Sequence, residues 1–165
     1  MWTRPFIIGL ALILAVFIFA GSAAGEMPGE QVESEAMQKL GQTYYLTQTE
    51  GTLIAYMVSD PQCPACQALQ ERIEEGMTPD VELLYLTVGF MGQESLHLAA
   101  ERLQRNLPVD GDEAVSENTR IAAEIGVRAV PTVFYQTPQG EVRKFTGSGK
   151  ENLEALQRLT RQAEE

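Results

Sequence analysis

Apolar residues recur along this chain with two different periods, and the change from one period to the other outlines the secondary structure. Short runs rich in β-branched and aromatic residues, such as TYYLT and TLIAYMV, favour strands, and the second run is almost wholly apolar, which is typical of a strand buried on both faces. Segments with apolar residues three and four positions apart favour helices instead. The predicted strands cover residues 43–47, 52–58, 81–88, 131–136 and 141–146, and the predicted helices cover residues 63–76, 93–106, 116–125 and the segment after Ser148, where Glu151 completes a capping box.

The order of these elements predicts an α/β domain over residues 42–165, with a helical insertion at about 89–126 that includes a loop at 107–115. Strand–helix alternation followed by a terminal hairpin and helix is typical of the thioredoxin fold. Residues 26–41 are polar and acidic apart from one short helical turn, and they are expected to form a linker. The predicted fold class is therefore an α/β thioredoxin fold with a helical insertion, preceded by a separate N-terminal segment.

That first segment, residues 1–25, differs in composition from the rest. Arg4 is its one charged residue before an unbroken apolar run that ends at Ala20, and small residues follow the run. A positive start, an apolar middle and a small-residue cleavage site, here after Ala24, are typical of a secretory signal peptide. An uncleaved membrane anchor formed by residues 5–24 is the open alternative, because a spanning helix needs roughly 20 apolar residues. Both interpretations place the rest of the chain outside the cytoplasm.

The charge balance excludes some partners. The 165 residues include 23 acidic and 12 basic side chains, which gives a formal net charge of −11. A surface of this charge repels phosphate backbones, and the clustered lysines and arginines of nucleic-acid-binding proteins are missing from the sequence. Nucleic acid is therefore not an expected partner.

The chain has two cysteines, Cys63 and Cys66, in the motif CPAC. Thiols of exported proteins commonly pair as structural disulfides. These two would close almost the shortest loop available, whereas the stabilisation that a disulfide gives grows with loop length. Redox activity is therefore favoured over a structural disulfide, and no cofactor is expected beyond the Cys63–Cys66 disulfide itself.

The position of Cys63 at the start of a predicted helix favours its thiolate, because free N–H groups and the helix dipole stabilise an anion there. The thiolate can attack a substrate disulfide, and Cys66, one helical turn later, can then attack Cys63 and release the substrate. Pro64 and Ala65, between the cysteines, include no histidine, so one source of thiolate stabilisation is missing. Asp60 is expected nearer the surface, where it either tunes the pair by its charge or is an ordinary anion beside the first turn.

Two further features have alternative interpretations. A zinc site needs four ligands, and His97 is the one histidine of the chain, so no metal is expected and His97 is expected to be solvated or partly buried. The apolar segment GFMG, residues 89–92, is either exposed near the active site, where it contacts unfolded substrate, or buried as a hinge into the insertion.

The chain carries the segments YMVSDPQCPAC, LLYLTVGFMGQESLHLAA and NTRIAAEIGVRAVPTVFY, which span most of residues 52–146. In these segments it resembles the catalytic domain of the DsbC/DsbG family of periplasmic protein disulfide isomerases, and it is closer to DsbG. The resemblance implies a cis-Pro131 against the CPAC helix, with the Val130 backbone free to pair with an extended substrate segment. It also implies isomerisation or reduction of cysteines in exported proteins, a periplasmic location, and a membrane thiol reductase of the DsbD type as the electron source.

Several features depart from that family. DsbC and DsbG carry an N-terminal dimerisation domain, whereas about 25 residues lie here between the predicted signal and the first strand. Val130 stands where the isomerases usually have threonine, and valine at this position resembles the oxidase DsbA. Met57 or Val58 occupies the region where thioredoxin-like reductases often have a buried acid. A DsbA-like oxidase and a non-redox binding or chaperone module with a thioredoxin fold therefore stay open as alternatives.

Overall fold

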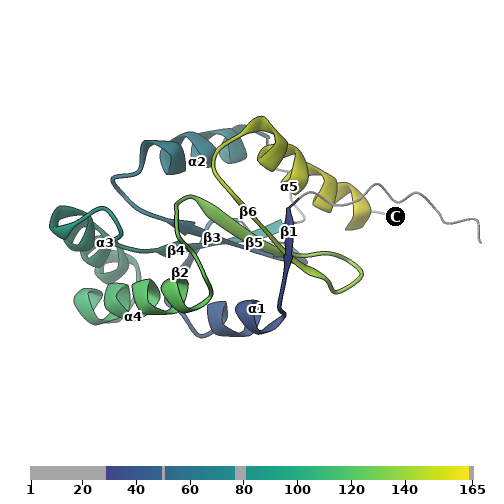
Figure 1. The fold of residues 1–165 in the computed structure, drawn as a ribbon. Helices are drawn as coiled ribbons and strands as arrows, with labels where there is room; N and C mark the ends of the chain where they lie inside the picture. The colour runs from purple at the N-terminus through teal and green to yellow at the C-terminus, as the bar shows by residue number, and fades with distance from the viewer. Residues whose placement is uncertain (1–28, 50, 77–80, 164–165) are drawn as a thin grey trace, which may run out of the picture.

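The computed structural model describes residues 29–49, 51–76 and 81–163, which form a three-layer arrangement of helices, a mixed sheet and helices (Figure 1). The strands are β1 (Glu30–Val32), β2 (Tyr45–Thr47), β3 (Leu53–Ser59), β4 (Val81–Thr87), β5 (Thr132–Gln136) and β6 (Val142–Thr146). The helices are α1 (Glu35–Leu40), α2 (Pro64–Gly76), α3 (Gln93–Asn106), α4 (Gly111–Glu124) and α5 (Lys150–Ala163).

The six strands lie in the order β1-β6-β5-β3-β4-β2. The central strand β3 is parallel to β4, with Ser59 opposite Thr87, and antiparallel to β5, with Val58 opposite Thr132. The carboxyl ends of β3 and β4 and the start of β5 therefore meet at the same end of the sheet. The segment after β3 holds both cysteines, so this end of the sheet is where a site can be assembled.

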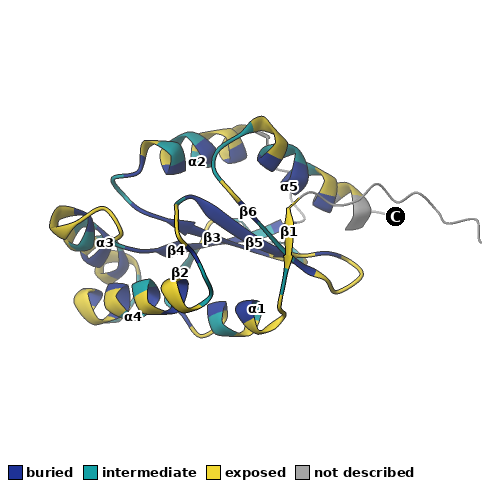
Figure 2. Ribbon diagram, viewed as in Figure 1, coloured by how far each residue is buried: buried dark blue, intermediate teal, exposed yellow. Residues whose placement is uncertain are grey.

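Each face of the sheet has its own apolar core (Figure 2). Helices α2 and α5 cover one face, and that core includes Cys63 and Cys66. Helices α1 and α4 cover the other face. Successive side chains of β3 alternate between the two cores, with Met57 in the first and Val58 in the second. This double burial explains why the β3 sequence is apolar at nearly every position.

Helices α3 and α4 are inserted between β4 and β5, which confirms the predicted helical insertion. Helix α4 begins at Gly111 rather than at Ser116, because the carboxylate of Asp110 caps it by accepting a backbone N–H of the first turn at 3.0 Å. A Cβ on residue 111 would lie 2.2 Å from the carbonyl oxygen of Ala100, so glycine lets the start of α4 approach α3. The second half of the loop predicted at 107–115 is therefore helical.

Asn118 of α4 joins the insertion to the sheet. Its side chain is fully buried, and its amide nitrogen donates to the carbonyls of Tyr44 at 2.7 Å and Thr87 at 3.1 Å. Its Oδ1 accepts the backbone N–H of Tyr44 at 2.9 Å. Buried polar groups are tolerated when they are hydrogen-bonded in this way, and the result is that α4 is fixed beside the end of β4.

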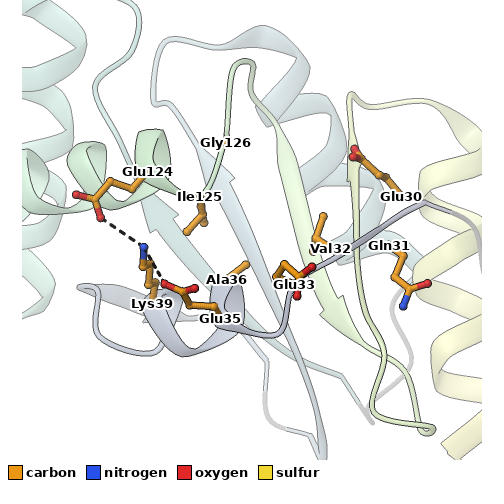
Figure 3. Close-up of a pocket in the computed structure, with 10 residues that line it drawn as sticks. All are labelled: Glu30, Gln31, Val32, Glu33, Glu35, Ala36, Lys39, Glu124, Ile125 and Gly126. Atoms are coloured by element: carbon orange, nitrogen blue, oxygen red, sulfur yellow. Dashed lines mark ion pairs between the residues drawn. The ribbon is translucent and has the colours of Figure 1, made fainter.

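Residues 30–40, expected to belong to a linker, are part of the domain. Strand β1 pairs antiparallel with β6 at the sheet edge, and Leu40 of α1 is fully buried in the second core. Strand β1, helix α1 and the end of α4 line a groove of about 700 Å³ (Figure 3), where Lys39 forms ion pairs with Glu35 at 3.2 Å and Glu124 at 3.9 Å. The short polar run EQV has no strand pattern of its own, so only the pairing with β6 identifies it as a strand.

The remaining elements lie close to their predicted bounds. Helix α2 begins at Pro64, directly after Cys63, and the predicted C-terminal hairpin is present as β5 and β6. Gly126 follows α4 with a φ of +80°, as expected for a glycine that ends a helix. Helix α5 begins at Lys150, two residues after the expected N-cap Ser148.

The predicted signal peptide or membrane anchor, residues 1–25, lies outside the described residues. Within the described ranges, none of the helices combines the length and the apolar character that crossing a membrane requires.

Candidate active site

Cys63 caps the start of helix α2. Its carbonyl accepts the backbone N–H of Gln67 at 3.2 Å, the first bond of the helical ladder, and Pro64 occupies the following position, where a missing N–H costs little. The Sγ of Cys63 itself accepts the backbone N–H of Cys66 at 3.2 Å. A serine or aspartate N-cap makes the same contact through its side-chain oxygen. An N–H donor and the positive end of the helix dipole therefore both face this sulfur.

Cys66 lies deeper, with 1% of its surface exposed compared with 4% for Cys63, and both residues are free thiols in this structure. Burial, followed by a hydrogen bond with the Cys63 side chain, raises the pKa of Cys66 to about 12. Hydrogen bonds from the Asp60 backbone and the Ser59 side chain oppose this rise. Cys66 is therefore held as a neutral thiol until the reaction changes its surroundings.

Val130 and Pro131 form the facing wall of the site. The peptide bond between them is cis, and Pro131 is buried at the start of β5. The thiol of Cys63 donates to the carbonyl oxygen of Val130 across 3.5 Å. The Pro131 carbonyl accepts the N–H of Gly147 at 2.8 Å, which ties this loop to the segment after β6. The structure thus brings together four of the residues that the sequence singled out, Cys63, Cys66, Val130 and Pro131.

Asp60 is not near the surface, as the sequence suggested, because only 1% of the residue is exposed. Its carboxylate points to the loop after β4 and accepts hydrogen bonds from four donors, namely the backbone N–H groups of Gln62, Phe90 and Met91 and the hydroxyl of Ser95. Its hydrogen bond to Cys66 comes from the backbone. The predicted tuning of the cysteines by the charge of this carboxylate stays a prediction, whereas its contacts show a structural link between two loops.

The other residues singled out lie around this centre. Pro64 is exposed at the first position of α2, and Ala65 is half-buried against the first core. Met57 is fully buried in the core that holds the cysteines, in the region where a buried acid was considered. His97 is exposed and lies 3.4 Å from Glu101. In the ranges that the structure describes, no three histidine, cysteine or acidic side chains gather in a way that suits a metal ion.

The segment GFMG is exposed rather than buried. Phe90 is 36% exposed and Met91 is 52% exposed, directly after the end of β4. Ser59, whose side chain hydrogen-bonds Cys66, is a residue of the site that the sequence analysis did not identify. Its position as the last residue of a buried strand, four positions before Cys63, was the signal that could have identified it.

The comparisons with known proteins agree with this geometry. A family model described as a thioredoxin-like domain matches residues 40–163, which is most of the chain. The chain belongs to the thioredoxin-like domain family. The thioredoxin-like fold with a helical insertion, predicted from the sequence, is therefore confirmed. No curated protein sequence matches the chain.

Solved structures share the thioredoxin-like fold at low identity. A periplasmic thioredoxin-like protein from Salmonella enterica serovar Typhimurium aligns with a TM-score of 0.60 and 15% identity, covering 78% of this chain and 98% of that one. The thiol-disulfide exchange protein α-DsbA2 from Wolbachia pipientis aligns with a TM-score of 0.58 and 12% identity, covering 78% and 92%. The catalytic domain of Proteus mirabilis ScsC aligns with a TM-score of 0.53 and 14% identity, covering 74% and 97%. These neighbours do not single out the DsbC/DsbG family, so that finer resemblance stays a prediction.

Proposed function

We propose that this thioredoxin-like protein is a thiol–disulfide oxidoreductase that acts on cysteines of exported proteins. The observation that carries the proposal is the setting of Cys63, whose sulfur caps a helix, accepts the N–H of Cys66 and faces the Val130 carbonyl. The sulfur of Cys63 faces a backbone N–H donor at the start of a helix, and a second thiol lies within one helical turn. A disulfide that only stabilised the fold would need neither the contacts of the Cys63 sulfur nor its position facing Val130.

The chemistry balances with these two residues alone. The Cys63 thiolate attacks one sulfur of a substrate disulfide, forms a mixed disulfide and releases the other substrate sulfur as a thiolate. Cys66 then loses its proton and attacks the Cys63 sulfur, which forms the Cys63–Cys66 disulfide and releases the second substrate thiolate. The substrate has gained two electrons and the protein dithiol has lost two.

The resemblance to the DsbC/DsbG family favours work as an isomerase or reductase. Turnover in that direction needs an electron donor for the Cys63–Cys66 disulfide, and a membrane thiol reductase of the DsbD type fits this role. The Salmonella neighbour is a periplasmic protein, which supports a periplasmic location for this chain. In that location the protein is either soluble after signal cleavage or anchored through residues 5–24.

A DsbA-like oxidase is the second candidate. The residue beside the nucleophile is Val130 rather than threonine, and one of the neighbours is a DsbA2 protein. An oxidase runs the same exchange in reverse. A substrate thiolate attacks the Cys63 sulfur of the Cys63–Cys66 disulfide, which forms a mixed disulfide and releases the Cys66 thiolate. A second substrate thiolate then attacks the substrate sulfur of the mixed disulfide, which forms the substrate disulfide and releases the Cys63 thiolate.

Trapping of free thiols in the cells that make the protein tests the proposal. An alkylating reagent of high mass would be added to intact cells, and the state of Cys63 and Cys66 would be scored by gel shift. A mainly reduced pair supports the isomerase or reductase, and a mainly oxidised pair supports the oxidase. Full retention of function by a Cys63→Ala, Cys66→Ala variant would instead show that the protein is a non-redox binding or chaperone module.

A further inference from the structure

The carboxylate of Asp60 holds two loops together at the active-site end of the sheet. Its Oδ1 accepts the N–H of Gln62, at 2.9 Å, in the turn that leads to Cys63. Its Oδ2 accepts the N–H groups of Phe90 at 2.7 Å and Met91 at 3.1 Å, in the loop after β4. A carboxylate that is almost fully buried is tolerated because backbone N–H groups and one hydroxyl compensate its charge. The Asp60 side chain thus links Phe90 and Met91 to the turn that leads to the nucleophile, while the Thr119 hydroxyl accepts the N–H of Gly89 at 3.3 Å.

The strand order places this loop on the opposite flank of Cys63 from Val130. Strand β3, which leads to Cys63, lies between β5 and β4 in the sheet. Val130 precedes β5, and the loop of residues 89–92 follows β4. A polypeptide that passes across Cys63 along this end of the sheet therefore has Val130 on one side and the loop on the other.

The loop is built to turn its apolar side chains outward. A Cβ on residue 89 would lie 2.3 Å from Cδ2 and 2.8 Å from Cα of Leu96, so glycine lets the backbone press against α3. Gly92 has a φ of +112°, which glycine adopts without steric cost, and α3 begins directly after it. Among the described residues, the large apolar side chains that are exposed are Phe90, Met91 and Ile54, and the first two are neighbours on this loop.

We propose that the loop of residues 89–92 is a docking surface for apolar side chains that flank the cysteine of a protein substrate, and that Asp60 is the positioning residue that fixes this surface beside Cys63. The inference rests on the proposed function. The segment that binds to this docking surface is an extended, apolar part of an unfolded polypeptide. In a folded protein, apolar side chains next to a cysteine are buried and cannot reach the surface. The position of the loop supports this interpretation, because one extended substrate segment can contact the Cys63 thiol, the Val130 backbone and the loop of residues 89–92 at the same time.

Two peptides of equal length test the docking surface. Each carries one cysteine as a mixed disulfide with glutathione, flanked by leucine and phenylalanine in one peptide and by serine and glycine in the other. With the reduced full-length protein, we expect the apolar peptide to react about tenfold faster, which corresponds to covering part of two exposed apolar side chains. A Phe90→Ser, Met91→Ser variant should lose this preference. Ile54→Ser is the matched control, because Ile54 is 41% exposed at the other end of β3, and it should keep the preference.

The role of Asp60 needs a readout that a general loss of stability would not change. In Asp60→Asn one carboxylate oxygen is replaced by an amide nitrogen, which cannot accept an N–H, so the side chain can no longer accept hydrogen bonds from both loops and the link between them is broken. The ratio of the two peptide rates should then fall to about that of the Phe90→Ser, Met91→Ser variant, and hydrogen exchange at the amides of Phe90 and Met91 should accelerate. If Asp60→Asn does not fold, Ser95→Ala, which removes one donor to the carboxylate, should lower the ratio partway and accelerate the same two amides.

The outcomes separate this inference from the proposed function. Reaction with glutathione disulfide alone reports the thiol chemistry, and its absence in the wild type would overturn the proposed function and the inference with it. If that reaction is present but both peptides react equally, or if Ile54→Ser lowers the preference as much as the loop variant does, the docking surface is refuted and the oxidoreductase stands. An unchanged peptide ratio in folded Asp60→Asn would refute the positioning role.

Discussion

The sulfur of Cys63 and the carbonyl oxygen of Val130 lie 3.5 Å apart, although 67 positions separate the two residues in the sequence. The carbonyl accepts the thiol in this reduced state. When Cys63 enters a mixed disulfide, its sulfur no longer carries a proton, and the Val130 carbonyl becomes free to accept another donor. A backbone N–H of the bound substrate is the donor that strand-like pairing would supply.

This relationship predicts that one backbone N–H near the substrate cysteine matters for the rate. In a series of peptides, each N-methylated at one position around the cysteine, one position should lower the rate of mixed-disulfide formation about fivefold, in line with the loss of one hydrogen bond. Quenched-flow kinetics with mass spectrometry would measure it. A peptide methylated far from the cysteine is the control, and equal rates across the series would contradict the pairing.

The hydrogen bond from the Ser59 side chain lowers the pKa of Cys66, against the larger effect of burial. Removing it in Ser59→Ala should raise that pKa, reduce the thiolate fraction at neutral pH and slow release of the mixed disulfide about fivefold. The rate–pH profile of the release step should shift to higher pH, while formation of the mixed disulfide changes little. Ser59→Thr keeps the hydroxyl and should restore most of the rate. An unshifted profile in Ser59→Ala would show that this hydroxyl has no part in the second step.

The raised pKa of Cys66 also predicts how stability depends on pH. The folded state binds the thiol proton more tightly than the unfolded state, whose pKa is the ordinary 9.0. The stabilisation is therefore complete below about pH 9 and is lost as pH rises toward the folded value of about 12. Buried tyrosines with raised pKa values act in the same direction, so the comparison must be made with Cys66→Ser.

Urea unfolding under reducing conditions at pH 8 and pH 10.5 would make that comparison. The wild type should lose more stability between the two pH values than Cys66→Ser, because at pH 10.5 the Cys66 thiol is ionised in the unfolded protein but stays protonated in the folded protein. Equal losses would show that the thiol of Cys66 ionises as easily in the folded as in the unfolded protein.

Asn118 predicts a stability effect away from the cysteines. Asn118→Ala removes one buried and two part-buried hydrogen bonds and leaves the backbone groups of Tyr44 and the carbonyl of Thr87 without these partners, so it should cost about 2–4 kcal/mol of unfolding free energy. Asn106→Ala is the control, because its side chain bonds a carbonyl of its own exposed helix end and should change stability by about 0.5 kcal/mol or less. Chemical denaturation measures both. A cost for Asn118→Ala as small as for the control would contradict the bridging role.

The sequence predicted the parts of the fold that depend on local signals. The apolar runs of β3 and β4 and the two-residue spacing of Cys63 and Cys66 each carry their own pattern, and the structure has strands and a helix start at these places. The cis form of the Val130–Pro131 bond was implied by the family resemblance and not by a local pattern. The insertion was also predicted, because the period of α3 and α4 is helical.

What the sequence could not predict depends on contacts between distant segments. Asp60 reads as a surface anion because its donors at Phe90, Met91 and Ser95 lie 30 to 35 residues away. Strand β1 consists of two polar residues and one valine, which show no strand pattern of their own, and it forms only through its pairing with β6. The start of α4 was missed because a glycine at position 111 lowers helix propensity, whereas the close approach to α3 requires it.

The central claim is that Cys63 attacks and Cys66 resolves, and trapping of the mixed disulfide tests it most directly. Reduced Cys66→Ser and Cys63→Ser variants would each be mixed with a disulfide-bonded protein substrate, quenched in acid and examined by non-reducing electrophoresis and mass spectrometry. The account predicts a stable adduct through Cys63 in Cys66→Ser and almost none in Cys63→Ser, where the remaining thiol is buried with a pKa of about 12. An adduct that forms through Cys66 as readily as through Cys63, or no adduct in either variant, would contradict the account.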